Sequence, residues 1–125
     1  MSIQILNPTC NLETILDGRG GIFTWFPNEP LVEFNMLYFN SGKIRGLHYH
    51  PEFVEYSLVV SGNGCFVYRE NIQDKNSEKT IHLSKGTCIR IEKNTYHTIH
   101  SINEMTIIAM LTKKWDDCEN PILRE

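Results

Sequence analysis

Two histidines that lie two residues apart, His48 and His50, are the side chains in this sequence best suited to chemistry. Alternate residues of an extended strand point to the same face, so both imidazoles project together from backbone positions about 6 to 7 Å apart. A carboxylate follows at Glu55 and a third histidine at His97. Imidazoles with a carboxylate suit either a divalent metal or proton transfer beside a carbonyl substrate. The residues alone leave both chemistries open, whereas the regular glycines and His97 argue against a merely solvated pair.

The composition sets broad limits on the function. A chain of 125 residues is long enough for a single domain with one hydrophobic core. Its 41% hydrophobic and 22% charged residues are ordinary for a globular protein. The net charge of -3 gives no sign of the basic stripe that nucleic-acid binding requires. We therefore expect no nucleic-acid partner, although local arginines can still bind an anionic substrate.

The cysteines and the terminal residues predict a reduced, cytoplasmic protein. The four cysteines are Cys10, Cys65, Cys88 and Cys118. They form no C-x-x-C pair and no short zinc-binding spacing, and the neighbours of Cys65 and Cys88 predict strand positions with buried thiols. The first five residues lack the features of a signal peptide, and no stretch approaches the roughly 18 apolar residues of a membrane span. We expect no membrane partner.

The rest of the chain predicts short strands separated by turns. Strands are expected at 32–40, 54–60, 65–68, 80–83, 87–91 and 105–112. Gly62-Asn63-Gly64 predicts a hairpin between the second and third of these strands, because glycine and asparagine tolerate positive φ. The polar stretch 71–79 predicts an exposed loop, and 12–16 predicts a single helical turn. Many short strands at regular spacing indicate an all-β sandwich or barrel.

The glycines, histidines and carboxylate together resemble a family pattern. The spacing matches the first motif of the cupin family at every marked position: Gly42, His48, His50, Glu55 and Gly62. The resemblance implies an all-β, single-domain cupin jelly-roll barrel over 1–125. Its core would span about 31–112, with an N-terminal arm at 1–30 and a C-terminal tail at 113–125.

The second cupin motif is only half present. Gly86 and His97 fit it, but Glu92, Asn94 and Ser101 replace its usual proline, glycine and asparagine. The first motif therefore carries the resemblance, and the second adds His97 to the candidate site.

The flanking residues resemble a narrower group of cupins that act on nucleotide-linked sugars. The stretch 17–20 (Asp-Gly-Arg-Gly) looks like the D-x-R-G element of these enzymes, and 45–49 is close to the R-G-L-H-Y run of dTDP-4-dehydrorhamnose 3,5-epimerases. Tyr38 and Arg45 with the histidine pair are similar to dTDP-4-keto-6-deoxyglucose 3,4-ketoisomerases. The resemblance implies isomerisation or epimerisation next to the ketone of a 4-keto-6-deoxy sugar, without a required cofactor, by a homodimer in polysaccharide or deoxysugar biosynthesis.

This chemistry assigns roles to particular side chains. A histidine suits the base because its ordinary pKa lies near working pH, and arginine forks match phosphate and enolate oxygens. The candidate catalytic residues are His48, His50, Tyr38 and Arg45. The candidate substrate-binding residues are Arg19, Arg69, Tyr49, His97 and Trp115. Trp115 stands where the epimerases carry a tyrosine acid, and an indole cannot donate such a proton. Tyr38 and the pair of His48 and His50 therefore favour ketoisomerase over epimerase chemistry.

Two other functions remain open from the sequence. His48, His50, Glu55 and His97 are the full ligand set of metal-binding cupins, which predicts a dioxygenase or a metal-dependent isomerase with Zn, Fe, Ni or Mn. A ligating imidazole has its lone pair committed, so a metal there excludes His48 as the base. The third possibility is a sugar-binding cupin without catalysis, because a fold does not fix a function.

Overall fold

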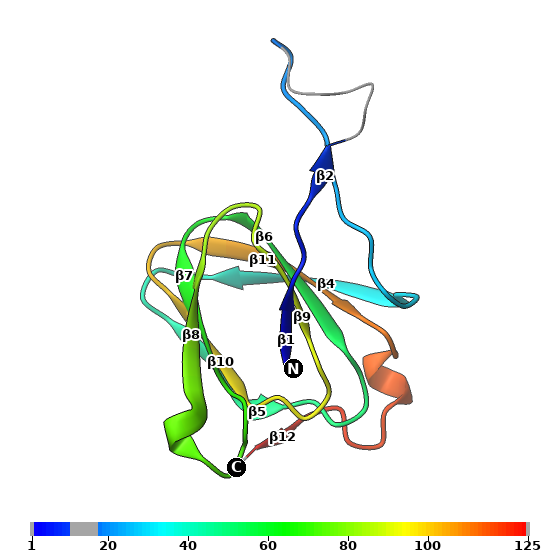
Figure 1. Ribbon diagram of the computed structural model, residues 1–125, viewed down its shortest axis with the longest axis vertical. Helices are drawn as coiled ribbons and strands as arrows, with labels where there is room; N and C mark the ends of the chain where they lie inside the picture. The colour runs from blue at the N-terminus through cyan, green and yellow to red at the C-terminus, as the bar shows by residue number, and fades with distance from the viewer. Residues whose placement is uncertain (1, 11–17, 125) are drawn as a thin grey trace.

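Two five-stranded antiparallel sheets pack face to face in the computed structural model, which describes residues 2–10 and 18–124 (Figure 1). The first sheet contains, in spatial order, β1 (Ile3–Ile5), β9 (Cys88–Ile91), β6 (Glu55–Ser61), β11 (Met105–Leu111) and β4 (Glu33–Phe39). The second contains β12 (Leu123–Arg124), β5 (Ile44–Tyr49), β10 (His97–Ser101), β7 (Gly64–Arg69) and β8 (Glu78–Leu83). This jelly roll confirms the predicted all-β fold.

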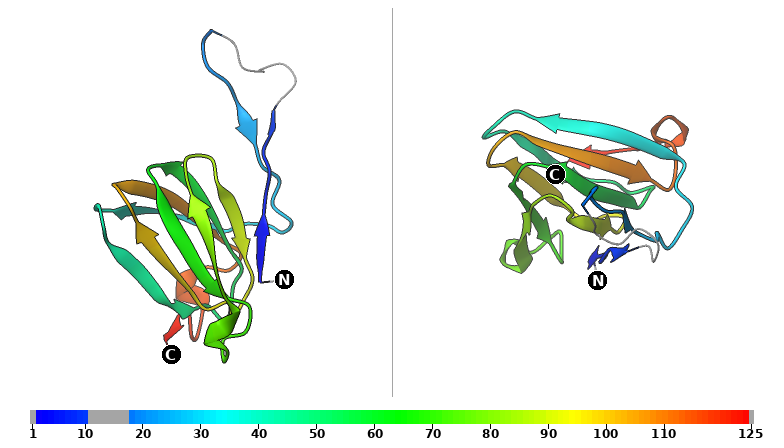
Figure 2. Two further views of the ribbon diagram at one scale, coloured as in Figure 1. Left: turned by 60° about the vertical axis from the view of Figure 1, so that its left-hand side comes forward. Right: turned by 90° about the horizontal axis from the view of Figure 1, so that it is seen from above.

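A small hairpin extends beyond the two sheets. Its strands, β2 (Thr9–Cys10) and β3 (Phe23–Thr24), pair with each other and project from one end of the molecule (Figure 2). The helical turn predicted at 12–16 lies outside the described residues. The described part of the chain contains two 3-10 helices, η2 (Lys75–Ser77) and η3 (Trp115–Asp117). Within it, no helix has the length and apolar character to cross a bilayer.

Six predicted strands are confirmed, with ends shifted by one or two residues: β4, β6, β7, β8, β9 and β11. Cys65 and Cys88 lie on β7 and β9 as expected, and both are free thiols. The stretch predicted as an exposed loop instead holds η2 and the first residues of β8. Strands also form toward both ends, because β1 joins the first sheet and β12 joins the second.

The predicted hairpin around Gly62 is wrong. Strand β6 pairs with β9 and β11, whereas β7 pairs with β8 and β10, so the turn carries the chain from one sheet to the other. A Cβ on Gly62 would lie within 2.1 Å of the Glu104 carbonyl oxygen, and one on Gly64 within 2.4 Å of the His100 oxygen. These glycines permit close approach of backbones, which a local pattern cannot distinguish from a hairpin turn.

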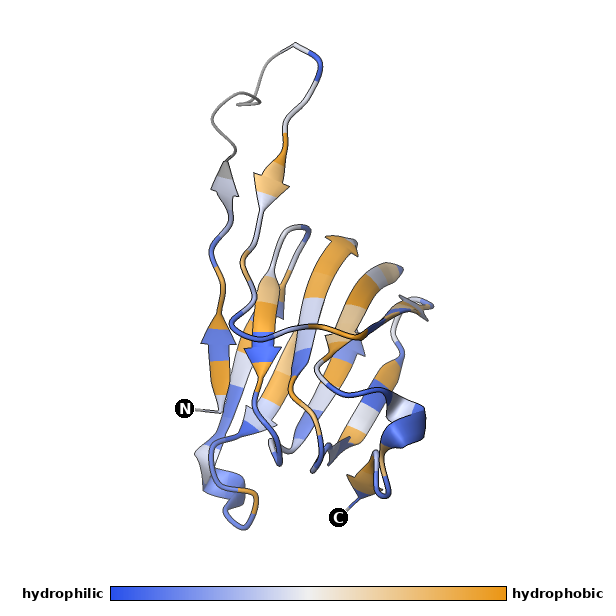
Figure 3. Ribbon diagram, turned by 90° about the vertical axis from the view of Figure 1, so that its right-hand side faces the viewer, coloured by the Kyte–Doolittle hydropathy of each residue, from blue (hydrophilic) through white to orange (hydrophobic). Residues whose placement is uncertain are grey.

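Apolar side chains from the inner faces of both sheets form the core. Residues of β11 alternate between buried and partly exposed, so every second side chain points inward. Ile107 of β11 packs in one buried cluster with Val59 of β6 and Phe66 of β7. Burying each such side chain contributes about 1.5 to 3 kcal/mol. Apolar residues recur along the strands, and polar residues gather in the connecting loops (Figure 3).

Candidate active site

A β-bulge in β5 changes the direction in which the side chains of this strand point. His48 lies opposite His97 of β10, but the next partners are Gly46 and Thr98, so Leu47 is the extra residue. The bulge has positive φ at two positions, 130° at Gly46 and 59° at Leu47. Because one extra residue reverses the alternation, side chains on both sides of the bulge can face the same cavity.

Gly46 is required by the close approach of β10. A Cβ at this position would lie 2.6 Å from the Thr98 Cα and 2.7 Å from the His97 carbonyl oxygen. The Leu47 backbone N–H donates to Thr98 Oγ1 at 3.0 Å, which satisfies a donor that the bulge removes from the ladder. The glycine thus holds the strand that carries His48 against the strand that carries His97.

Three imidazoles meet at the end of the second sheet. The ring centroids of His48 lie 4.7 Å from His50 and 4.8 Å from His97, and those of His50 and His97 are 5.4 Å apart. Two rings are oriented by backbone carbonyls: His50 Nδ1 donates to Pro121 O at 2.9 Å, and His97 Nδ1 donates to Thr95 O at 2.8 Å. Their Nε2 atoms are therefore the ones left for other chemistry.

Glu55 completes the group from β6. Its Oε1 lies 3.5 Å from His50 Nε2, and its Oε2 accepts a hydrogen bond from the Ser57 hydroxyl at 2.8 Å. The carboxylate is buried with 7% exposure. The Nε2 of His50 thus lies within ion-pair distance of a carboxylate, while its Nδ1 donates to Pro121.

His48 differs from the other two imidazoles because its Nδ1 has no backbone carbonyl partner among the described residues. Its Nδ1 is buried and has no hydrogen-bond partner among the described residues. Burial, helped by the charges of the neighbouring imidazoles, lowers the pKa of His48 to about 4. Burial likewise lowers the pKa of His97 to about 4, against the opposing effect of its bond to Thr95. Neutral His48 is therefore available as a proton acceptor at pH 7, but it is a weak base that needs help from a nearby cation.

A cavity of about 620 Å³ opens between the sheets over these rings. It brings together six residues predicted from the sequence: His48, His50, Glu55, His97, Arg45 and Trp115. Phe53 stacks on the His50 ring with centroids 4.6 Å apart, and Trp115 lies 6.1 Å from both rings. An apolar wall beside the imidazoles suits a sugar and excludes water from it.

Two predicted tyrosines lie outside this cavity. Asn35, Leu37 and Phe39 of β4 line it, so Tyr38 points to the opposite face. Tyr38 is 53% exposed, and a hydrogen bond with the Glu104 carboxylate raises its pKa. Tyr49 falls between His48 and His50 on β5 and likewise turns away from the cavity. The structure therefore places Tyr38 and Tyr49 outside the cavity that holds the three imidazoles.

Two predicted arginines are also placed elsewhere. Arg69 is buried, its guanidinium carbon lies 4.3 Å above the Tyr96 ring, and its Nε lies 3.6 Å from Glu78 Oε2. This arrangement ties β7 to β8 and lies outside the cavity lining. Arg19 is exposed in the connection between β2 and β3, also outside the lining. Asp17, the first residue of the same predicted element, lies outside the described residues.

Sequence comparison identifies the family. Residues 15–120 match the family described as polysaccharide biosynthesis C-terminal domain. The chain belongs to this family. A search of curated proteins found no significant match.

Solved structures show the fold of this polysaccharide biosynthesis domain. A 3,4-ketoisomerase from Helicobacter canadensis has a TM-score of 0.82 and 19% identity, covering 100% of this chain and 92% of that one. An RmlC epimerase from Mycobacterium tuberculosis has a TM-score of 0.79 and 15% identity, covering 98% and 68%. A third match is a mutant of the 3,4-ketoisomerase QdtA from Thermoanaerobacterium thermosaccharolyticum in complex with TDP-4-keto-6-deoxyglucose. It has a TM-score of 0.78 and 12% identity, covering 99% of this chain and 88% of that one. At these identities the likeness establishes the shared cupin jelly roll.

The structure groups three of the four predicted metal ligands. The possible ligand atoms of His48, His50 and His97 lie within 4.8 Å of one another, which fits a divalent ion. Glu55 lies outside this cluster and is engaged by Ser57 and His50. A metal held by the three imidazoles would polarise a substrate oxygen, and it would take the lone pair that His48 needs as a base.

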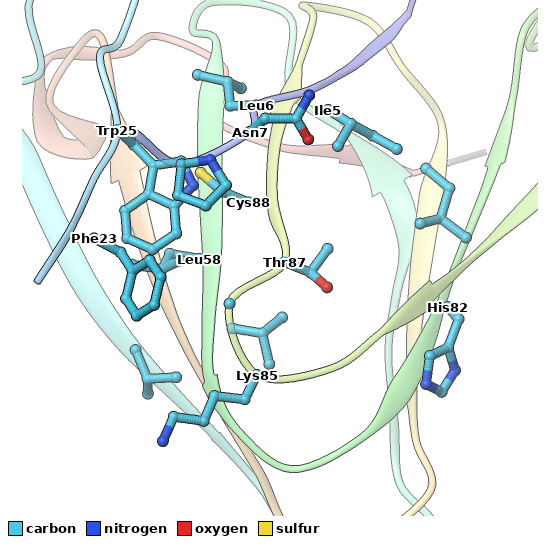
Figure 4. Close-up of a pocket in the computed structure, with 15 residues that line it drawn as sticks. Ile5, Leu6, Asn7, Phe23, Trp25, Leu58, His82, Lys85, Thr87 and Cys88 are labelled. Atoms are coloured by element: carbon cyan, nitrogen blue, oxygen red, sulfur yellow. The ribbon is translucent and has the colours of Figure 1, made fainter. Parts of the chain in front are cut away.

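The polysaccharide biosynthesis domain has a second cavity, of about 850 Å³, on the outer side of β6. It lies beneath the hairpin and is lined mainly by apolar side chains such as Trp25, Phe23 and Leu58 (Figure 4). His82 lies apart from these rings at the edge of the cavity. Among the described residues, no group of potential metal ligands gathers in this outer cavity. The three histidines lie instead in the cavity of about 620 Å³ between the sheets, which we call the inner cavity.

Proposed function

We propose that this chain is a 3,4-ketoisomerase of a nucleotide-linked 4-keto-6-deoxy sugar. The observation that carries the proposal is a cavity lined by three imidazoles and by arginine, with no phenol among its lining residues. A carbonyl isomerisation of this kind needs a base, a group that moves protons between oxygens, and a cation for the developing charge. The inner cavity supplies all three from residues of one chain.

His48 is the proposed base. Its neutral imidazole removes the proton from C3, next to the C4 ketone, and the electron pair of that bond forms an enediolate with its charge on O4. The proton is then returned to C4 on the same face, while the hydroxyl proton moves from O3 to O4, so that C3 becomes the ketone and C4 carries the hydroxyl. His50, whose ring is fixed by Pro121 and Glu55, is placed to carry the oxygen-bound proton. No atom is gained or lost, so the proposed reaction requires no cofactor.

The absence of a tyrosine separates this proposal from 3,5-epimerisation. Inversion at a carbon needs a base on one face and an acid on the other. All five tyrosines of the sequence are among the described residues, and none lines the inner cavity. Trp115 occupies the wall beside His50 instead, and an indole cannot serve as the acid. A single histidine that removes and returns the proton on one face fits the geometry better.

The substrate is proposed from the likeness and from the charges at the cavity. The QdtA mutant was solved with TDP-4-keto-6-deoxyglucose. Arg45 lines the cavity of this chain and is exposed at its mouth, where a guanidinium can pair with a diphosphate. Trp115, at 38% exposure, offers an apolar surface next to the same opening.

The test is incubation of the protein with TDP-4-keto-6-deoxyglucose, followed by NMR of the sugar. We expect the 4-keto signals to be replaced by those of the 3-keto isomer, and we expect dTDP to raise the melting temperature. Inverted C3 or C5 stereochemistry would indicate an epimerase. Binding of dTDP without turnover of any keto sugar would favour a sugar-binding cupin.

Elemental analysis tests the metal alternative, for which the cluster of three imidazoles is the motivating observation. The ketoisomerase proposal predicts full turnover after dialysis against a chelator. Stoichiometric Zn, Fe, Ni or Mn that is lost together with activity in His97→Ala would support the metal-dependent reading and overturn His48 as a free base.

We also propose a homodimer that buries the outer face of β4. Phe34, Met36 and Tyr38 alternate along this strand and are 77%, 71% and 53% exposed, which is a large apolar patch for a monomer. Light scattering should give a dimer for the wild type and a monomer for Met36→Lys. Leu47→Lys, which alters an exposed side chain on β5 of the other sheet, is the control and should remain dimeric. A monomeric wild type would refute the proposal.

A further inference from the structure

The segment 120–124 forms one wall of the inner cavity. Its strand β12 lies beside β5 (Figure 1). In this pairing Arg124 lies opposite His48 and Leu123 lies opposite Tyr49. Ile122 and Arg124 line the cavity together with the histidines. The sequence offered no motif here, so this wall was absent from the predicted site.

Two tethers hold the segment against the residues that carry His50. The Pro121 carbonyl accepts the hydrogen bond from His50 Nδ1 at 2.9 Å. The neighbouring Asn120 N–H donates to the Glu52 carboxylate, which also accepts from Lys113 Nζ at 2.9 Å. The segment is thus fixed by one contact inside the site and one beside it.

Arg124 stands level with the reacting groups. On successive strands, Arg124 lies opposite His48 and His48 lies opposite His97, so the three form a row across the second sheet. Directly opposite residues have Cβ atoms about 4.5 to 5.5 Å apart, which is within easy reach for a long side chain. Burial is the main cause of the low pKa of His48, and the charge of Arg124 adds to it. Arg45 lies further along β5, opposite Ile99.

We propose that Arg124 binds the substrate oxygen that becomes negative when His48 removes the neighbouring proton. The inference rests on the proposed isomerase function and adds a residue to it. A guanidinium carries N–H donors and a permanent charge, and donors aimed at a developing oxyanion stabilise the transition state more than the ground state. The position beside His48 assigns Arg124 to the reacting end of the sugar and leaves Arg45 for the diphosphate.

The experiment compares Arg124→Gln with Arg124→Lys and Arg45→Gln on TDP-4-keto-6-deoxyglucose. We expect Arg124→Gln to lower kcat by about 10²-fold while KM and the Kd for dTDP change by less than about threefold. Arg124→Lys should restore part of kcat, because it restores the charge. Arg45→Gln should show the opposite pattern, a raised KM and a weaker dTDP complex. Lys75→Gln, which removes an exposed charge in η2, is the matched control and should behave as the wild type.

The outcomes separate the two proposals. Wild-type turnover with an unchanged kcat in Arg124→Gln would overturn the inference and leave the isomerase standing. A loss of dTDP affinity parallel to kcat would also overturn it, because Arg124 would then hold the diphosphate. A wild type without turnover would overturn the isomerase and the inference together. A separate readout is the NMR signal of the His50 Nδ1 proton, which Glu52→Ala should weaken if the tether positions the segment.

Discussion

Two cavities of this molecule differ in what lines them. The inner cavity, of about 620 Å³, gathers three imidazoles, a carboxylate and two arginines. The outer cavity, of about 850 Å³, is larger and mainly apolar. Volume therefore does not identify the reactive site in this molecule. Converging polar groups with shifted pKa values identify it, because they make acid–base chemistry possible.

The difference arises from the strands that build each wall. The inner cavity is walled by β5, β10 and β12, whose cross-strand neighbours place Arg124, His48 and His97 in a row. The outer cavity is covered by the hairpin, and its Cys88 thiol has a pKa raised to about 11 by burial. That thiol is protonated at neutral pH and is therefore a poor nucleophile. The titratable groups of the inner cavity thus come mainly from the second sheet, whereas the outer cavity offers a thiol that is protonated at neutral pH.

The same substitution in each cavity should give the largest contrast. His48→Asn removes the proposed base from the inner cavity, and we expect kcat to fall by about 10³-fold. His82→Asn, at the edge of the outer cavity, should leave kcat unchanged. Steady-state kinetics on TDP-4-keto-6-deoxyglucose measures both variants, and circular dichroism checks that each is folded. Equal losses in the two variants would remove the distinction between the cavities.

Glycine substitutions should test the two cavities through stability. Gly46→Ala places a Cβ 2.6 Å from the Thr98 Cα at a positive φ, so we expect a loss of about 3 kcal/mol or more in the free energy of unfolding. Gly86 lines the outer cavity at φ 92°, but a Cβ there meets no atom within 4 Å. Gly86→Ala should therefore cost only the backbone strain, about 1 to 2 kcal/mol. Urea unfolding measures both, and a cheaper Gly46→Ala would contradict the bulge geometry.

Low pH should destabilise the fold, because His48 and His97 of the inner cavity must then bind protons. In the folded chain His48 and His97 have pKa values of about 4, below the ordinary 6.5. Between pH 4 and pH 6.5 the unfolded chain therefore binds more protons than the folded one. Stability is complete above pH 6.5 and is lost as the pH falls toward 4. The buried His97 alone accounts for a loss on the order of 3 kcal/mol at pH 4. Urea unfolding across this range should show the slope, flatter in His97→Gln and unchanged in Cys88→Ala. A stability independent of pH would contradict the burial of the imidazoles.

Part of the site followed from the sequence because its determinants are local. Alternation along an extended strand placed His48 and His50 on one face, and their rings lie 4.7 Å apart in the structure. The prediction of Tyr38 rested on the family resemblance, and alternation could not check it, because both faces of β4 carry apolar side chains and the pattern did not reveal which one points inward. The glycines near Gly62 were equally ambiguous, since tight turns and close backbone approach select the same residue.

The sequence by itself predicted six of the strands and the shared face of the histidine pair, but it did not show that the glycines near Gly62 let the chain cross between the sheets. Only the tertiary structure decided which of the further candidates join that pair, and it alone added Arg124. His97 and Arg124 arrive from β10 and β12, and Arg69 and Tyr38 are directed elsewhere. The physical reason is range: side-chain direction along a strand is set by neighbours, whereas strand pairing and sheet closure depend on contacts between residues far apart in the chain.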